Sequence, residues 1–66
     1  MKTIQLNGEE YSTAASSLVE LLEALKIPLS TVLLELNGTA LLRHELEKAP
    51  LNASDHIEIL KVVAGG

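Results

Sequence analysis

Residues 56–63 read His-Ile-Glu-Ile-Leu-Lys-Val-Val, and this stretch decides the fold. It is rich in β-branched residues, and the turn-forming segment Asn52-Ala53-Ser54-Asp55 comes directly before it. Both features are typical of a β-strand. The sequence therefore predicts a last strand over residues 56–63.

Two Asn-Gly pairs predict the turns of two β-hairpins earlier in the chain. Asn7-Gly8 follows the alternating residues 3–6, and Asn37-Gly38 follows residues 32–36, in which alternate positions are apolar. Asn-Gly is a strong hairpin signal because both turn positions tolerate a positive φ. Return strands are expected over residues 9–12 and 39–42. Residues 43–50 are mixed and polar, which favours a loop with a brief helical turn.

A helix is predicted between the two hairpins. Ser17-Leu18-Val19-Glu20 has the pattern of a capping box, in which the serine hydroxyl and the glutamate carboxylate satisfy free backbone amides at the helix start. One apolar stripe follows at helical spacing, formed by Leu18, Leu21, Leu22 and Leu25. Pro28 disfavours helical geometry at the residue before it, so the helix is expected to end near Lys26.

The order of these elements predicts the fold class. A hairpin, a helix, a second hairpin, a loop and a last strand form an α+β arrangement, with a four- to five-stranded mixed sheet and one main helix on one face. The long crossover allows the two terminal strands to pair in parallel at the centre. This is the β-grasp (ubiquitin-like) architecture. We expect residues 1–63 to form the domain and residues 64–66 to form a flexible tail.

Length and composition exclude several classes of protein. A chain of 66 residues has room for one domain with a thin core and no deep cleft. The absence of cysteine excludes disulfides, thiolate metal sites and a cysteine nucleophile. Nine acidic and five scattered basic residues give a net charge of -4, which argues against nucleic acid as a partner. Tyr11, the single aromatic residue, is interpreted as a packing residue.

The beginning of the sequence predicts the location. Polar and apolar residues alternate from Met1 to Gln5, without the apolar run of a signal peptide or membrane helix. We therefore expect a cytoplasmic protein that does not enter a membrane.

The ending Ala64-Gly65-Gly66 is the candidate functional segment. Glycine has no side chain to clash in a narrow channel, so such a tail can reach ATP bound in an adenylating enzyme. An α-carboxyl group has a pKa of roughly 3.3–3.7, so it is an anion at neutral pH and can attack an α-phosphate without a base. The resulting acyl adenylate can react with a sulfur nucleophile to give a thiocarboxylate, or with an amine to give an amide. The chain would then be a cosubstrate and not an enzyme.

Some apolar residues of the sheet are expected to face away from the helix. In a regular last strand, Leu60 and Val62 lie on the face opposite to Ile57 and Ile59, and Leu33 is displaced in the same way in the third strand. We predict that Leu33, Leu60 and Val62 form a docking patch for partners. The alternative is a bulge or a covering loop that removes the patch.

Other candidate groups have ordinary structural interpretations. His44 and His56 lack a third ligand at metal-site spacing and are interpreted as exposed loop histidines, so no metal site is predicted. Ser16 and Ser17 are interpreted as loop and cap residues and not as nucleophiles.

The chain resembles the ThiS family of sulfur carriers over essentially its whole length. The resemblance is carried by Ile4-Gln5-Leu6-Asn7-Gly8, Leu21-Leu22, Glu35-Leu36-Asn37-Gly38 and Val62-Val63-Ala64-Gly65-Gly66. One departure is Leu46, which stands where relatives often have an aromatic residue.

This resemblance implies a covalent role for Gly66, with Gly65 and Ala64 threading into a partner. On this resemblance, we expect an E1-like adenylyltransferase to adenylate Gly66 with ATP, a donor such as a cysteine desulfurase to supply sulfur, and thiazole synthase to consume it in thiamine biosynthesis. No cofactor is expected to bind this chain itself. The alternatives are a carrier like the small subunit of molybdopterin synthase, a ubiquitin-like protein modifier, and a β-grasp interaction module with an inert tail.

Overall fold

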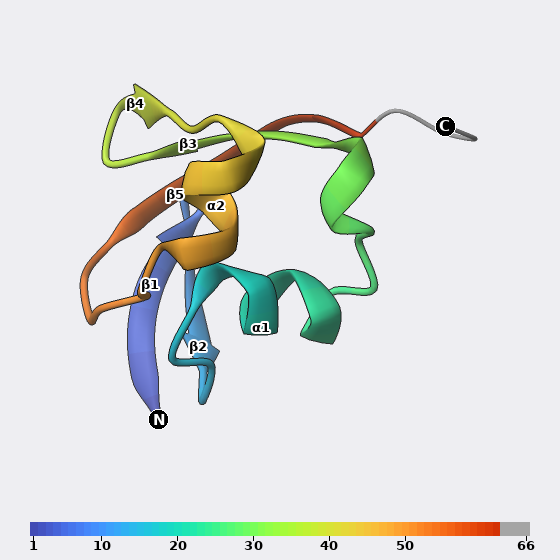
Figure 1. The fold of residues 1–66 in the computed structure, drawn as a ribbon. Coiled ribbons are helices and arrows are strands. Elements are labelled where there is room, and N and C mark those ends of the chain that lie inside the picture. Colours follow the sequence, from blue (N-terminus) through green and yellow to red (C-terminus); the bar gives the residue numbers. More distant parts are fainter. Residues whose placement is uncertain (63–66) are drawn as a thin grey trace.

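The structure is a computed structural model that describes the backbone of residues 1–62 and the side chains of residues 1–60. Within these residues one five-stranded sheet has the strand order β2-β1-β5-β3-β4 (Figure 1). The elements in chain order are β1 Lys2–Leu6, β2 Glu9–Thr13, α1 Leu18–Ala24, the 3-10 turn η1 Leu29–Thr31, β3 Val32–Leu36, β4 Thr39–Ala40, α2 Arg43–Lys48 and β5 His56–Val62. The predicted last strand is confirmed as far as Val62, and residue 63 lies outside the described part.

The first and last strands lie side by side at the centre of the sheet, as predicted. Gln5 and Leu6 of β1 pair in parallel with His56 and Ile57 of β5. The other contacts between neighbouring strands are antiparallel, so the sheet is mixed. Both helices lie on one face of this sheet (Figure 1). The arrangement confirms the predicted β-grasp fold.

The core lies between that face and the helices. Eight large side chains are almost completely buried, namely Ile4, Leu18, Leu21, Leu22, Leu34, Leu46, Leu51 and Ile57. Burying each of them stabilises the fold by about 1.5–3 kcal/mol. The helical stripe is confirmed at its first three leucines, whereas Leu25 is only partly buried against the core. Tyr11 also packs against this cluster, as predicted.

The start of α1 follows the predicted cap with one difference. Ser17 is the N-cap, and its Oγ accepts a hydrogen bond from the Glu20 amide at 3.1 Å. The Glu20 carboxylate does not bind the Ser17 amide, as a capping box requires. It accepts instead from the amide of Ser16 at 2.7 Å and from the Ser16 hydroxyl at 2.9 Å. The carboxylate therefore fixes the residue before the cap and determines how the chain enters the helix.

The end of α1 comes earlier than expected. The helix ends at Ala24, and Lys26 has a left-handed conformation with φ of 62°. The amide of Ile27 donates to the Leu22 carbonyl and that of Lys26 to the Glu23 carbonyl. These two bonds form a Schellman motif, which satisfies the last carbonyls of a helix. The helix α1 thus ends before Ile27, the residue whose helical conformation Pro28 disfavours.

Residues 29–50 differ most from the sequence prediction. Residues 43–48, expected as a loop with a brief turn, form the helix α2, because Leu46 is buried against α1 and Glu45 Oε1 accepts from the Leu42 amide at 2.8 Å. The strand expected over residues 39–42 is short and ends at Ala40. The turn η1 was not predicted. In the first hairpin, β2 continues one residue further to the buried Thr13.

The contact between Glu20 and Ser16 makes a pH-dependent contribution to stability. The two hydrogen bonds from Ser16, the backbone bond first, hold the pKa of Glu20 below its ordinary value. Because the folded pKa is the lower one, this stabilisation is full above the unfolded pKa and is lost as pH falls through the folded pKa. We expect Glu20→Gln to lower the urea midpoint at pH 7, and the difference from wild type to shrink as pH falls below 4.5.

The matched control is Glu23→Gln in the same helix, whose exposed carboxylate accepts no hydrogen bond from a described residue. Its urea midpoint should follow the wild-type value across the same pH series. If the urea midpoint of Glu20→Gln differs from that of wild type by the same amount at all pH values, the ionised Glu20 carboxylate does not provide this stabilisation.

Candidate functional site

The strand that leads to the C-terminal tail is anchored by two asparagine side chains. Asn7 and Asn37 have φ values of 51° and 52° and occupy the first positions of the two predicted turns. Asn7 Oδ1 accepts from the amide of Ile59 at 2.8 Å, and Asn37 Oδ1 accepts from the amide of His56 at 2.8 Å. Each Asn-Gly pair therefore turns its own hairpin and also binds the backbone of β5.

Asp55 completes the anchor at the start of β5. Its Oδ1 accepts from Asn37 Nδ2 at 3.1 Å, and its Oδ2 accepts from the Asn52 amide at 2.8 Å. The sequence pattern indicated both asparagines only as turn formers. Their contacts to β5 are far apart in sequence, so a pattern of neighbouring residues could not reveal them.

β5 contains a bulge at Leu60. Ile59 pairs with Leu34, whereas the preceding residue of β3, Leu33, pairs with Lys61, so Leu60 is the extra residue. The regular alternation from which we predicted the docking patch is therefore broken at this point. Val62 pairs through its backbone with Val32, and its side chain lies outside the described residues.

Leu33 and Leu60 are nevertheless exposed, with 54% and 49% of their surface accessible. Leu42, which sequence reasoning missed, is 62% exposed. The amide of Leu41 donates to the Leu34 carbonyl at 3.1 Å, so the same register places Leu42 opposite Leu33. We call Leu60, Leu33 and Leu42 the leucine row. The sequence signal for Leu42 was its position next to Leu41 after β4. Adjacent residues of an extended chain point to opposite faces, and Leu41 packs against the core.

A hollow of about 270 Å³ lies on the sheet between the two Asn-Gly turns. It is lined by Gln5, Gly8, Glu35, Gly38, His56, Ile57 and Glu58. Glu35 of β3 and Glu58 of β5 are direct partners in the antiparallel register, and both line the hollow. Neither glutamate had a role in the prediction from sequence.

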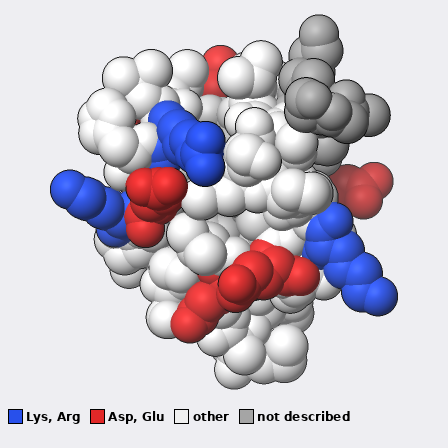
Figure 2. Space-filling view, turned by 45° about the vertical axis from the view of Figure 1, so that its right-hand side comes forward, with Lys and Arg blue, Asp and Glu red and all other residues white. Residues whose placement is uncertain are grey.

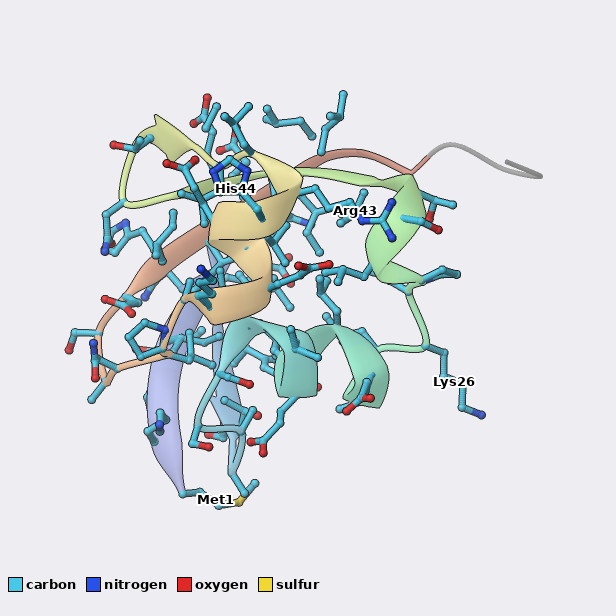
Figure 3. All side chains as sticks on the ribbon, viewed as in Figure 1. Met1, Lys26, Arg43 and His44 are labelled. Carbon is cyan, nitrogen blue, oxygen red and sulfur yellow. The ribbon has the colours of Figure 1, made fainter. Side chains whose placement is uncertain are left out.

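The histidines lie on different elements and do not form a common site. His44 is exposed on α2 (Figure 3), and His56 is the first residue of β5, so neither is the loop residue that we expected. Among the described residues, no three histidine, aspartate or glutamate side chains are placed to hold a metal ion.

Charged side chains elsewhere are dispersed. Figure 2 shows lysine and arginine side chains standing apart from one another over the visible face. The ion pair between described residues joins Arg43 and Glu47 at 3.7 Å on the surface of α2. An exposed pair of this kind contributes little to stability.

The predicted covalent site lies outside the described residues. This holds for Gly66 and for the threading residues Ala64 and Gly65, since the description of the chain ends at Val62. What the structure provides is the strand from which they continue and the sheet surface beside it. In the described part of the chain, no helix is long and apolar enough to cross a membrane.

A mixed sheet with a central parallel pair of terminal strands, packed on one face against helices, defines a ubiquitin-like protein. A model of the ThiS family matches residues 4–66, and the chain belongs to this family of sulfur carriers.

Solved structures agree with this assignment. A crystal structure of thiamine biosynthesis protein ThiS from Geobacter metallireducens has a TM-score of 0.79 and 29% identity, covering 97% of this chain and 99% of that one. The NMR solution structure of a thiamine biosynthesis protein from the same organism has a TM-score of 0.77 and 29% identity, covering 97% and 87%. A search of curated proteins found no match.

The anchor of β5 can be tested at a single amide. Asn7→Gly keeps a residue that accepts positive φ but removes the acceptor of the Ile59 amide. A net hydrogen bond is worth about 0.5–1.5 kcal/mol, so native-state hydrogen exchange at Ile59 should accelerate by up to about tenfold.

Asn37→Gly is the matched control for this experiment, because it removes the acceptor of His56 and leaves that of Ile59 in place. It should accelerate exchange at His56 more than at Ile59. If each variant accelerates hydrogen exchange equally at Ile59 and at His56, the two asparagines do not hold these two amides independently.

Proposed function

We propose that this protein carries sulfur for thiazole formation in thiamine biosynthesis, with Gly66 as the residue that bears the sulfur. The observation that carries the proposal is the ThiS family match, which extends from residue 4 through the Gly65-Gly66 ending. Similarity to a structure of a thiamine biosynthesis protein supports the same pathway.

The first step is adenylation by an E1-like enzyme that binds ATP. A carboxylate oxygen of Gly66 attacks the α-phosphorus, the bond between the α- and β-phosphates breaks, and pyrophosphate leaves. The carboxylate is already ionised at neutral pH, since a terminal carboxyl has a pKa of roughly 3.3–3.7. This chain therefore does not need a general base of its own.

The second step places sulfur on the activated carbonyl. The outer sulfur of a persulfide on a donor such as a cysteine desulfurase attacks the carbonyl carbon, AMP leaves, and an acyl disulfide forms. A thiol then acts as the reductant: it attacks the donor's sulfur and breaks the S–S bond, which leaves the thiocarboxylate on Gly66 and a disulfide on the donor. Thiazole synthase then takes the sulfur. The chain contains no cysteine, so the sulfur has to come from another protein or molecule. In this scheme the protein is a carrier located in the cytoplasm, and the bond-making groups belong to its partners.

The fold supports this role by holding β5 firmly. β5 pairs with β1 on one side and β3 on the other, and Asn7 and Asn37 bind its backbone. Residues 64–66 continue from a strand at the centre of the sheet. The glycines at positions 65 and 66 lack side chains that would collide with the walls of a narrow channel.

Intact-mass analysis tests the chemistry directly. We expect the protein incubated with its cognate adenylating enzyme, ATP and a sulfur donor to gain the mass of one sulfur in exchange for one oxygen. A chain lacking Gly66 should remain unchanged. Conjugates of higher mass would indicate a ubiquitin-like modifier instead, and an unmodified wild-type terminus would contradict the proposal.

The tail can be tested separately from the fold. Gly65→Val adds a β-branched side chain next to the reacting residue, so kcat/KM for pyrophosphate release by the adenylating enzyme should fall at least tenfold. The urea midpoint should not change. Ala53→Val is the control, because it enlarges a small exposed residue in the loop before β5. If kcat/KM for pyrophosphate release is the same for Gly65→Val and Ala53→Val, the enzyme does not require a residue without a side chain at position 65.

A further inference from the structure

The two Asn-Gly turns have the same local sequence and the same geometry. Leu6-Asn7-Gly8 and Leu36-Asn37-Gly38 are identical tripeptides, and φ is positive at both residues of each Asn-Gly pair. Each pair links two neighbouring antiparallel strands, so both are two-residue turns of type I′. Asn-Gly is also a dipeptide that modifies itself readily, because a glycine without a side chain leaves its nitrogen free to attack the asparagine carboxamide. The two turns are therefore candidate modification sites that can be compared directly.

The modification needs only water besides the protein. The amide nitrogen of the glycine loses its proton to water and forms a bond to Cγ of the asparagine. The bond between Cγ and Nδ2 breaks, ammonia leaves, and a five-membered succinimide ring remains. Water then opens the ring at one of its two carbonyl groups, which gives either aspartate or isoaspartate. Isoaspartate has one extra methylene group in the main chain.

The intact turns prevent this reaction. Ring closure requires the glycine nitrogen to lie on the same side of the Cα–C bond as Cβ of the asparagine. A type I′ turn has a ψ of about 30° at its first position, which places this nitrogen almost opposite Cβ. The carboxamide is held as well, because Asn7 Oδ1 accepts from the Ile59 amide and Asn37 Oδ1 from the His56 amide. Each turn therefore has to open before it can be modified.

The two turns differ in how much structure has to open. β2 pairs with β1 through five residues and ends at the buried Thr13, whereas the edge strand β4 pairs with β3 through two residues (Figure 1). Both asparagines bind β5 in the same way, through their own amide and through Oδ1. Asn37 has one further restraint, the bond from its Nδ2 to Asp55 Oδ1 at 3.1 Å. A single exposed hydrogen bond offsets less than the longer ladder of the first hairpin, so the second turn opens more often.

We propose that Asn37 is a self-modification site, at which the Gly38 nitrogen converts the anchor at the start of β5 into an aspartyl or isoaspartyl residue. Asp55 is the residue that restrains this reaction, because it holds the carboxamide in place. The modification is independent of the chemistry at Gly66.

Both products at position 37 hold β5 less firmly than asparagine does. Each replaces the Nδ2 donor by a carboxylate oxygen, which then lies next to the Asp55 carboxylate as a like charge. The isoaspartyl product also lengthens the two-residue turn, so the acceptor of the His56 amide is displaced. At position 7 no described carboxylate binds the asparagine side chain, so an aspartate there keeps its acceptor for the Ile59 amide. The effect on β5 is therefore specific to the second turn.

Peptide mapping by mass spectrometry of the purified full chain, incubated at mildly alkaline pH, tests the site. In the folded protein, Asn37 should be converted about tenfold faster than Asn7, or more. In concentrated urea the two identical tripeptides should react at nearly equal rates. Asp55→Ala should accelerate the reaction at Asn37 by about threefold and leave the rate at Asn7 unchanged.

Three results would overturn the proposal. They are equal rates at the two asparagines of the folded wild type, a faster reaction at Asn7, and an equal acceleration of both sites by Asp55→Ala. Because both sites lie in one molecule, a general loss of stability is recognised by its effect on both.

The effect on β5 is tested with two charge-matched variants. Asn37→Asp reproduces the aspartyl product, and native-state hydrogen exchange at the His56 amide should accelerate by about threefold at neutral pH. Asn7→Asp is the control, and exchange at the Ile59 amide should stay close to the wild-type rate. Equal protection of the two amides in their respective variants would show that modification of Asn37 does not loosen β5.

Discussion

The structure depends on the short parallel contact between β1 and β5. Only two residue pairs form this ladder, Gln5 with His56 and Leu6 with Ile57, yet it joins the two ends of the chain at the centre of the sheet. Parallel neighbours need a long crossover, and here α1, β3, β4 and α2 lie between them in sequence. Asn7 extends the contact beyond the end of β1 by binding the amide of Ile59. The helices can cover one face because this pairing fixes which side chains point inward.

The sequence predicted best what neighbouring residues determine. The turns at Asn7 and Asn37, the cap at Ser17 and the first part of the leucine stripe depend on contacts within a few residues, and all are present. The bulge at Leu60 depends on how β5 matches β3 across the sheet, and α2 depends on the burial of Leu46 against α1. Such long-range contacts leave a weak trace in local periodicity. Leu33 and Leu60 were predicted to be exposed from strand alternation and are exposed, whereas Leu42 and the register pair of Glu35 and Glu58 depend on how neighbouring strands match and were missed.

The two faces of the sheet follow different requirements. The inner face is close to an optimum for folding, with buried aliphatic residues and, among the described side chains, no buried polar atom without a partner. The opposite face combines the exposed leucine row with Glu35 and Glu58, two residues of like charge in direct register, which is unfavourable on neighbouring strands. A thin core in a chain of 66 residues leaves little excess stability, so these features have to be balanced by good packing on the other side.

The central position of β5 also has a mechanical consequence. In the proposed function, an enzyme that takes up residues 64–66 pulls on the chain where β5 ends, and the component of that force along β5 acts on the strand itself. The hydrogen bonds to β1 and β3 lie on both sides of that axis, so the force loads them together in shear and does not open them one at a time. An edge strand such as β4, with two residues, would peel away from its single neighbour. The domain can therefore be pulled at the end of β5 and keep its shape.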